Sequence, residues 1–411
     1  MEIRVNIRPL AMILAGGKGE RLYPLTAHRT KPAVHFGGIY RLIDFVLSNM
    51  VNSGIYSIYV LTQYKAQSLL KHLQLGWVST YPMDSFFIIP VPAQMRLRET
   101  WYLGTADAVY QNIYLIKQFN PDVVLVFGAD HVYFMDVRQM LNYHLTKNAD
   151  VTVATISYPI SECHRFGVVV IDENWQIKEF KEKSLNPPSM PGNPQIGLVS
   201  MGNYIFNTQV LLEELMADAE DKHSSHDFGK DILPRICKTR RVFAYNFCHN
   251  KLPGMKKPNC YWRDVGTITS YYEANMDLKN PMPSLNLYNP KWPMRSVKYH
   301  DPPAKVVVDA EGRIGHLENS LVAGGSIVSG GWVRDSIIGR NVFVDGRALV
   351  EESIIIGNVV VEVGAQIRRA IIDEGNVIKS GERIGYDLDK DAERFYLDTS
   401  SGIVVVPKKA G

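Results

Sequence analysis

The chain has 411 residues, of which 46% are hydrophobic and 21% charged, with a formal net charge of +3. A chain of this length exceeds the size at which one hydrophobic core stops growing, so we expect two domains. The mild charge and the lack of a long Lys/Arg block exclude a nucleic-acid binder that depends on many phosphate contacts. No apolar run approaches the roughly 20 residues of a membrane span, so we expect no membrane partner.

The cysteines predict the compartment. None of the four, at positions 163, 237, 248 and 260, forms a C-x-x-C pair. We therefore expect reduced thiols of a cytosolic protein, and neither a disulfide framework nor a zinc site. Residues 1–10 lack the apolar core of a signal peptide, which also favours a cytoplasmic location.

An apolar run, Leu10 to Ala15, predicts a buried strand and leads directly into a glycine-rich, basic loop. The loop residues are Gly16, Gly17, Lys18, Gly19 and Arg21, and Arg29 and Lys31 follow. Glycines allow close backbone approach to a ligand, and Arg and Lys form charge-assisted bonds to phosphate oxygens. The spacing matches neither a P-loop nor a dinucleotide fingerprint. Phosphate binding and an ordinary glycine turn with solvated basic residues both stay open at this point.

Strand and helix patterns alternate through about the first 160 residues. We expect helices over 40–52, 65–75, 105–118 and 137–146, and strands over 58–61, 123–127 and 151–156. This alternation predicts an α/β domain with a Rossmann-like, doubly wound, mostly parallel sheet. Ligands of such sheets bind at the carboxyl ends of the strands, where the glycine loop and Asp130 both fall.

The next segments depart from this alternation. Three short strands are expected within 166–204, and they carry Lys183 and Ser200. Between positions 280 and 303 there are six prolines, too many for a helix or a central strand. We therefore assign a catalytic domain to 1–280, a proline-rich linker to 281–305 and a further domain to 306–411.

The last hundred residues contain an internal repeat. Four segments, beginning at Asn319, Asp335, Glu352 and Arg369, recur every 16 or 17 residues as NSLV, DSII, ESII and RAII. Within a coil, apolar residues recur at about every sixth position. This rhythm is typical of a left-handed parallel β-helix, although an irregular β-sandwich remains an alternative.

Several motifs together resemble one known family. They are LAGGKGERLYPLTAHRTKPAVHFGG, YRLIDFVLSN, TQY (62–64), YLGTADAV (102–109), SSHDFGKDILP and YWRDVGT. The chain resembles bacterial glucose-1-phosphate adenylyltransferase, also called ADP-glucose pyrophosphorylase, over nearly its whole length. The resemblance implies a GT-A-like nucleotidyltransferase domain followed by a β-helix. It also implies Mg²⁺-dependent transfer of the adenylyl group of ATP to glucose 1-phosphate, for glycogen or α-glucan synthesis.

The resemblance also implies a set of site residues. It assigns catalysis to Arg21, Lys31 and Asp130, and Mg²⁺ binding to Asp130 and Asp264. ATP would be bound by Leu14, Ala15, Gly16, Gly17, Gly19, Arg21, Lys31, Gln63, Gln94, Gly104, Thr105 and Ala106. Glucose 1-phosphate would be bound by Tyr102, Gly167, Glu182, Lys183, Ser200 and Asp264. Relatives usually have proline where this chain has Ser184, which predicts a looser sugar loop.

Regulation is a further implication of the resemblance. Members of the family are usually homotetramers controlled by sugar phosphates or AMP, bound between the catalytic domain and the β-helix. The candidate effector residues here are His28, Arg29, Arg41, Arg368 and Arg369. His28 stands where some members have an effector-binding lysine, so the effector's identity does not follow from the sequence.

Three alternatives remain. Another sugar nucleotidyltransferase would use the same residues with a different base. An acyltransferase would fit the β-helix, but such enzymes generally need a histidine base, and no histidine follows His316. A non-catalytic regulatory subunit would have no chemical need to retain Asp130, Lys183 and Asp264 together.

Overall fold

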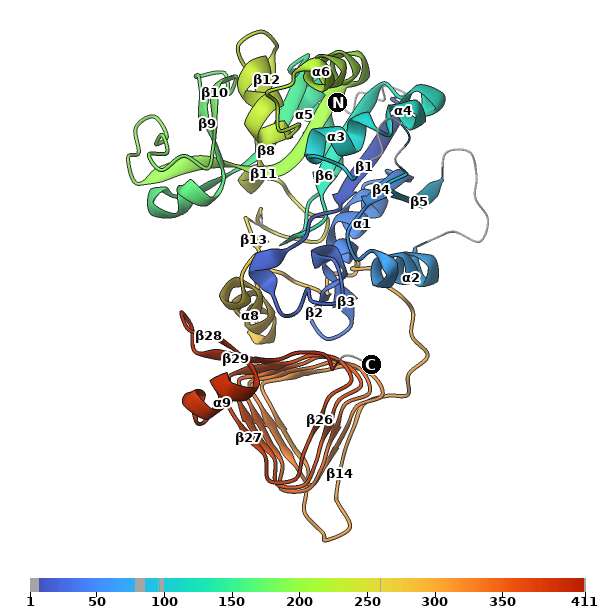
Figure 1. Cartoon of the computed structure of the whole chain (residues 1–411), viewed down its shortest axis with the longest axis vertical. Helices are drawn as coiled ribbons and strands as arrows, with labels where there is room; N and C mark the ends of the chain where they lie inside the picture. The colour runs from blue at the N-terminus through green and yellow to red at the C-terminus, as the bar shows by residue number, and fades with distance from the viewer. Residues whose placement is uncertain (1–6, 78–85, 95, 97–99, 259, 410–411) are drawn as a thin grey trace.

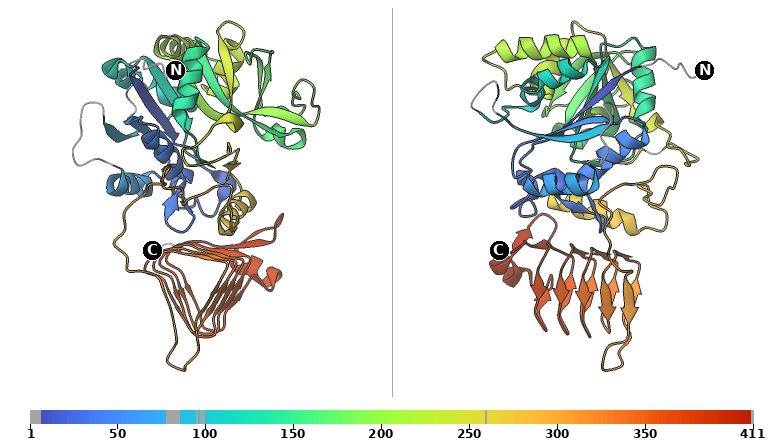
Figure 2. Two further views of the ribbon diagram at one scale, coloured as in Figure 1. Left: turned by 180° about the vertical axis from the view of Figure 1, so that it is seen from behind. Right: turned by 90° about the vertical axis from the view of Figure 1, so that its right-hand side faces the viewer.

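The structure is a computed structural model that describes residues 7–77, 86–94, 96, 100–258 and 260–409. An α/β part stands above a triangular β-helix (Figure 1). A second view shows the coils of the β-helix stacked side by side (Figure 2). No helix in the described part of the chain is long and apolar enough to cross a membrane.

A mixed sheet forms the centre of the α/β part. Its strands run in the order β10-β9-β11-β6-β1-β4-β5. Strand β8 also pairs with β11, and β12 pairs with β8. The bounds are β1 Pro9–Ala15, β4 Ser57–Thr62, β5 Phe87–Pro92, β6 Val123–Gly128, β8 Val151–Pro159, β9 Gly167–Ile171, β10 Ile177–Glu182, β11 Ile196–Asn207 and β12 Val242–Asn246. Strands β1, β4, β5 and β6 are parallel, whereas β11 is antiparallel to β6 and β8. The predicted Rossmann-like sheet is confirmed.

Helices cover both faces of this sheet. They are α1 Leu42–Asn52, α2 Gln67–Gly76, α3 Thr105–Tyr110, α4 Ile113–Phe119, α5 Val137–Thr146, α6 Thr208–Glu220 and α7 Leu233–Ile236. Helix α8, Ile268–Met276, lies between the sheet and the β-helix (Figure 1). Side chains alternate along β1, so Ala11 and Ile13 enter one hydrophobic core while Leu10 and Met12 enter the other. A strand buried on both faces explains the continuous apolar run seen in the sequence.

One predicted helix is divided in the structure. The sequence predicts a single helix over 105–118, but α3 ends at Tyr110 and α4 begins at Ile113. The side chain of Asn112 donates hydrogen bonds to the Ala108 carbonyl oxygen (2.8 Å) and to the Tyr102 hydroxyl (2.9 Å). Asparagine competes for backbone groups in this way, which favours a break in the helix.

The β-helix consists of three parallel sheets. They are β14-β17-β20-β23-β26, β15-β18-β21-β24-β27 and β16-β19-β22-β25-β29, with β28 added antiparallel at the end of the third. The third sheet contains the four repeats found in the sequence, as β16 Leu321–Val322, β19 Ile337–Ile338, β22 Ile354–Ile355 and β25 Ala370–Ile372. Leu321, Ile337, Ile354 and Ile371 lie in register from coil to coil. The predicted β-helix is confirmed.

The remaining strands of the β-helix are short. They are β14 Lys305–Val307, β15 His316–Glu318, β17 Ile327–Ser329, β18 Trp332–Arg334, β20 Phe343–Val344, β21 Leu349–Glu351, β23 Val360–Val361, β24 Gln366–Arg368, β26 Val377–Ile378, β27 Arg383–Ile384, β28 Tyr396–Asp398 and β29 Ile403–Val406. Helix α9, Leu388–Arg394, precedes β28.

The linker and the core tie the two parts together. Residues 280–304 contain no helix or strand, but they are packed: Trp292 is 1% exposed and donates to Asn49 (3.3 Å). A third hydrophobic core joins α8 to the outer face of the β-helix through Tyr271, Ile354 and Ile371. The α/β part and the β-helix therefore share buried apolar surface.

The cysteines differ in part from expectation. The structure pairs Cys248 with Cys260 in a disulfide, whereas Cys163 and Cys237 are buried free thiols. The expectation of four reduced thiols is therefore wrong for two of them. The two cysteines are 12 residues apart in the sequence and their Cα atoms are 4.4 Å apart. No short Cys motif in the sequence indicates this pairing.

Candidate active site

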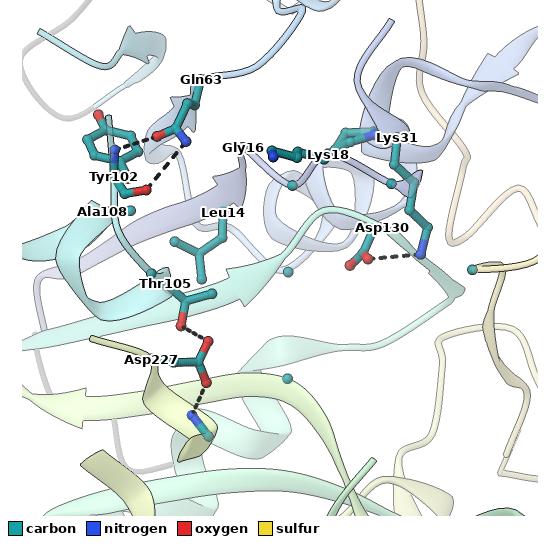
Figure 3. A pocket seen from close by; sticks show the side chains of 18 of the residues that line it. Leu14, Gly16, Lys18, Lys31, Gln63, Tyr102, Thr105, Ala108, Asp130 and Asp227 are labelled. Carbon is teal, nitrogen blue, oxygen red and sulfur yellow. Dashed lines mark hydrogen bonds and ion pairs between the residues drawn. The ribbon is translucent and has the colours of Figure 1, made fainter. Parts of the chain in front are cut away.

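A cleft of about 760 Å³ opens at the carboxyl ends of β1, β4 and β6 (Figure 3). Many of the predicted site residues line it: Leu14, Gly16, Gly17, Gly19, Arg21, Lys31, Gln63, Tyr102, Gly104, Thr105, Asp130, Glu182 and Lys183. Ala15, Gln94, Ala106, Gly167, Ser200 and Asp264 are not among the lining residues. Clefts of this size with few converging polar groups are the usual form of small-molecule sites.

The glycine loop follows β1 at one side of the cleft. Gly19 has φ +65°, and a Cβ at this position would lie 2.8 Å from the Cβ of Lys31. Glycine therefore serves two purposes here, because it permits the left-handed backbone and the close approach of Lys31. The hydroxyl of Thr26 donates to the Gly19 carbonyl oxygen (3.0 Å), which holds the loop's far end.

Two acidic residues from distant parts of the chain meet beside this loop. Asp130 follows β6, and Asp264 ends β13 (Trp262–Asp264), which pairs antiparallel with β7 (His131–Tyr133). Ligand atoms of Asp130, His131 and Asp264 all lie within 4.8 Å of one another. Carboxylate oxygens at such separations suit a divalent cation that prefers oxygen ligands.

A lysine ammonium lies between these two carboxylates. Lys31, in the 3-10 helix η2 (Lys31–Ala33), places its Nζ 2.9 Å from Asp130 Oδ2 and 3.0 Å from Asp264 Oδ1. Two arginines also approach Asp264: Arg21 at 3.9 Å and Arg165 at 3.8 Å. The pair of carboxylates therefore attracts positively charged groups, as the ligands of a metal cation must.

Burial and the opposite charges act against each other on this cluster. Burial alone would raise the pKa of each carboxyl group, but Lys31 and His131 together outweigh it and hold the pKa of Asp130 and Asp264 below the usual range. Burial alone would lower the pKa of Lys31, but Asp130 and Asp264 outweigh it and raise that pKa. All three groups are therefore charged at neutral pH.

A second group of predicted site residues is gathered around β10, and two of them, Glu182 and Lys183, line the cleft. Lys183 follows β10, has φ +48°, and lies 3.3 Å from the carboxylate of Glu182. Burial raises the pKa of Glu182, against the opposing effect of Lys183. The Ser200 hydroxyl, next to Tyr204, accepts from the Gly202 N–H (3.2 Å). Gly167 starts β9 and pairs with Glu182.

The third wall of the cleft is built by the GTADA segment. Gln63 binds the backbone of Tyr102 through both ends of its amide, at 2.7 and 3.4 Å. Gly104 leaves no room for a side chain, since a Cβ would lie 2.2 Å from the His226 carbonyl oxygen. Gln94, the weakest of the predicted ATP contacts, is exposed beyond β5.

Asp227 and Arg165 are charged residues of the site that were not assigned from the sequence. Asp227 lines the cleft and accepts a hydrogen bond from the Thr105 hydroxyl (3.0 Å), which joins the SHDFGKD and GTADA segments. Arg165, at the end of the 3-10 helix η3 (Ile160–Arg165), reaches Asp264. The motif around Asp227 was a visible signal, but nothing in the local sequence distinguishes Arg165 from a solvated arginine.

The candidate effector residues are spread over the boundary between the two parts. Arg29 is 3% exposed and forms ion pairs with Asp373 (2.9 Å) and Glu374 (3.5 Å) of the β-helix. Arg41 donates to the Ser68 carbonyl oxygen (2.9 Å), and Arg369 donates to that of Ser401 (3.1 Å). His28 is exposed on the loop before Arg29, and Arg368 lies at the end of β24 near the ring of Tyr386.

Comparison with known proteins agrees with the fold and the cleft. Residues 10–281 match a family model described as nucleotidyl transferase, and residues 302–406 match one described as GlmU-like, C-terminal hexapeptide. The fold and the site thus define an enzyme of the nucleotidyl transferase class. The acyltransferase alternative, which depended on the repeat alone, does not fit the first of these matches.

Relatives narrow the class further. The chain is similar to proteins named glucose-1-phosphate adenylyltransferase from Thermus thermophilus, with 55% identity over 98% of this chain and 99% of the relative. Those from Deinococcus radiodurans and Mycolicibacterium smegmatis are 48% and 49% identical, covering 98% and 97% of each chain. The chain belongs to the glucose-1-phosphate adenylyltransferase family. Nucleotidyltransferases of this kind generally use a divalent metal.

Proposed function

We propose that this protein transfers the adenylyl group of ATP to glucose 1-phosphate, which gives ADP-glucose and pyrophosphate. The observation that carries the proposal is the meeting of Asp130 and Asp264 beside the glycine loop, with Lys31 between them. The names of the relatives supply the substrates. The product would be the activated glucose for glycogen or α-glucan synthesis.

The chemistry requires little covalent participation from the protein. An oxygen of the sugar phosphate attacks the α-phosphorus of ATP, and pyrophosphate departs on the opposite side. The enzyme must hold two polyanions in line and neutralise the charge that develops between them. The cleft supplies Arg21 and Lys31 beside the glycine loop and Lys183 at the end of β10.

The residues divide between the two substrates. The backbone of Gly16, Gly17 and Gly19, together with Arg21 and Lys31, would hold the triphosphate, because arginine binds phosphate in a bidentate manner and lysine as a point charge. The other proposed ATP contacts are Leu14, Ala15, Gln63, Gln94, Gly104, Thr105 and Ala106. Lys183 would bind the phosphate of glucose 1-phosphate and Glu182 a sugar hydroxyl, with Tyr102, Gly167, Ser200 and Asp264 beside them.

Magnesium is the proposed metal, and Asp130 and Asp264 are its proposed ligands. Mg²⁺ prefers one or two carboxylates and takes its remaining ligands from water and phosphate, which fits two carboxylates at the edge of a phosphate site. When bound, the ion would stabilise negative charge on the phosphate oxygens.

The proposal also includes an effector site at the boundary with the β-helix and a homotetrameric assembly. Arg29 and Arg41, at the boundary with the β-helix, are the best-placed candidates for binding a sugar phosphate or AMP, with His28, Arg368 and Arg369 farther out. The side chains of His35 and Arg41 each have a buried nitrogen atom without a partner in the described residues. Such atoms would be satisfied by an anion. We also propose a cytoplasmic homotetramer.

The test is pyrophosphate release from each nucleoside triphosphate in turn, with glucose 1-phosphate and Mg²⁺. We expect ATP to support release far faster than UTP, dTTP, GTP or CTP. Faster release with another nucleotide would assign the protein to a different sugar nucleotide. No release with any nucleotide, with or without sugar phosphates and AMP as effectors, would favour the non-catalytic subunit.

A further inference from the structure

The position of Lys31 affects metal binding as well as phosphate binding. Its ammonium group approaches Asp130 Oδ2 (2.9 Å, Figure 3) and also Asp264 Oδ1 (3.0 Å), which are carboxylate oxygens of both proposed metal ligands. A divalent ion held by these carboxylates would need the same space, at about 2.1 Å from its oxygens. Two cations cannot both occupy this gap, because their charges repel and the oxygens are shared.

Lys31 also has a second place to go. Its Cβ packs directly under Gly19, so the root of the side chain touches the loop that would cradle the triphosphate. Rotation of the flexible four-carbon stem moves the ammonium from the carboxylates toward that loop without any movement of the backbone. Nucleotide phosphates would attract the ammonium in that direction.

The two carboxylates differ in what remains after Lys31 leaves. Asp264 still has Arg21 and Arg165 within 4 Å, whereas Asp130 has only the His131 ring, at 3.6 Å, in the described residues. Asp130 therefore becomes an uncompensated carboxylate at that moment. A cation that enters would be held most strongly by Asp130.

We infer that Lys31 occupies the metal position in the free enzyme, so that the divalent ion binds tightly only after nucleotide phosphates have drawn Lys31 away. This inference rests on the proposed function, since it takes Asp130 and Asp264 as the metal ligands. The free enzyme would thus not carry a resident metal.

The test measures Mn²⁺ binding to the full chain without any nucleotide, from the electron paramagnetic resonance signal of free Mn²⁺. We expect weak binding to the wild type and a dissociation constant lower by about 10-fold or more in Lys31→Gln, the fold-change that corresponds to one charge-assisted bond. Lys31→Arg keeps the charge and should bind Mn²⁺ as weakly as the wild type. Lys18→Gln is the matched control, because Lys18 is an exposed lysine of the same loop whose nearest acidic partner is Glu20.

The possible results distinguish the role of Lys31 from the identity of the metal ligands. Equal Mn²⁺ affinity in the wild type and Lys31→Gln, or a gain that Lys31→Arg shares, would overturn the role of Lys31. If Lys31→Gln gains affinity but Lys31→Gln/Asp130→Asn keeps that gain, Asp130 is not the ligand, and both the inference and the proposed metal site fail. Adenylyl transfer by the wild type is measured separately and does not depend on either result.

A thermal readout covers the case in which Lys31→Gln is unstable without metal. Removal of Lys31 leaves two carboxylates close together, of which that of Asp264 is largely buried, so the metal-free variant should unfold at a lower temperature than the wild type. Added Mn²⁺ should then raise the unfolding temperature of Lys31→Gln markedly and that of the wild type little, since a ligand stabilises the state to which it binds. The same rise in both proteins would overturn the inference.

Discussion

Asp130 and Asp264 come together through a small antiparallel pair of strands. Strand β7 begins one residue after Asp130, and its pairing with β13 sets Asp264 opposite His131. The position of each carboxylate therefore depends on main-chain hydrogen bonds between segments that lie far apart in the sequence. Substitution of one side chain should change the chemistry of the site without changing its framework.

Asp130→Asn tests this directly. The amide keeps the shape of the side chain but loses the negative charge that would hold the metal, so we expect kcat to fall by about two orders of magnitude or more. Circular dichroism and the unfolding temperature should show an intact fold. A variant that keeps near-normal turnover would remove Asp130 from the mechanism.

Lys183→Gln tests the sugar-phosphate side. Loss of one charge-assisted bond to phosphate, worth roughly 1.5–3 kcal/mol, should raise the KM for glucose 1-phosphate about 10–100-fold. The KM for ATP should change little, because Lys183 follows β10, which three strands separate from β1 and the glycine loop. A change in the KM for ATP alone would reverse the assignment of the two subsites.

The sequence predicted the residues of the cleft better than their arrangement. Gly19, Lys31 and Asp130 belong to recognisable motifs, so their presence in one cleft followed from the parallel sheet. The contact of Lys31 with both carboxylates depends on β7–β13 pairing across more than a hundred residues, which no local pattern records. Arg165 was missed for the same reason, since its partner Asp264 is distant in the chain.

At the scale of secondary structure, the long periodic segments were predicted well. Helix α5 has the predicted bounds, Val137–Thr146, and β6 differs by one residue. Strand β5, Phe87–Pro92, was missed: it contains two prolines, which argue against a strand, but it lies at the edge of the sheet, where proline is tolerated. Edge position is a property of the assembled sheet and cannot be read from six residues.

The corners of the β-helix show a similar limit. The first residue of each repeat has positive φ: Asn319, Asp335, Glu352 and Arg369. Asparagine and aspartate adopt this left-handed conformation readily, whereas Glu352 and Arg369 do so at a cost. The repeat was recognised from its isoleucines, and the strain at two of its corners became visible only in the structure.

Glu352→Asn should therefore stabilise the protein. Asparagine relieves the strain of the left-handed backbone, so we expect the free energy of unfolding to rise by about 0.5–1 kcal/mol. Chemical denaturation measures the change. Glu318→Asn, in strand β15, is the matched control and should bring no gain. Unchanged or lower stability in Glu352→Asn would show that the corner is not strained.

At the scale of the whole molecule, the boundary between the two parts is rich in positive charge. Arg29 and Arg41 of the α/β part and Lys408 of the β-helix surround His35, with His72 nearby. Burial first, and then Arg41 and Arg29, lower the pKa of His35 well below its usual value. His35 is thus neutral in the folded protein, whereas the unfolded chain binds a proton near pH 6.5.

This difference predicts how stability depends on pH. Below the ordinary histidine pKa only the unfolded state gains the proton. The free energy of unfolding therefore decreases as the pH is lowered, by up to about 1.4 kcal/mol from about pH 7.5 to 5.5. His35→Gln should remove this part of the fall, as measured by denaturation at both pH values. An equal fall in the variant would show that His35 takes up a proton in the folded protein.

The apolar contact between α8 and the third sheet of the β-helix limits how this chain can be recombined. Ile337, Ile354 and Ile371 point away from the interior of the coil and are covered by the α/β part. A chimaera that exchanges β-helices between relatives should fold well only if the donor also contributes the matching α8 and linker. An isolated fragment of either part would expose this apolar surface to water and should precipitate when expressed alone.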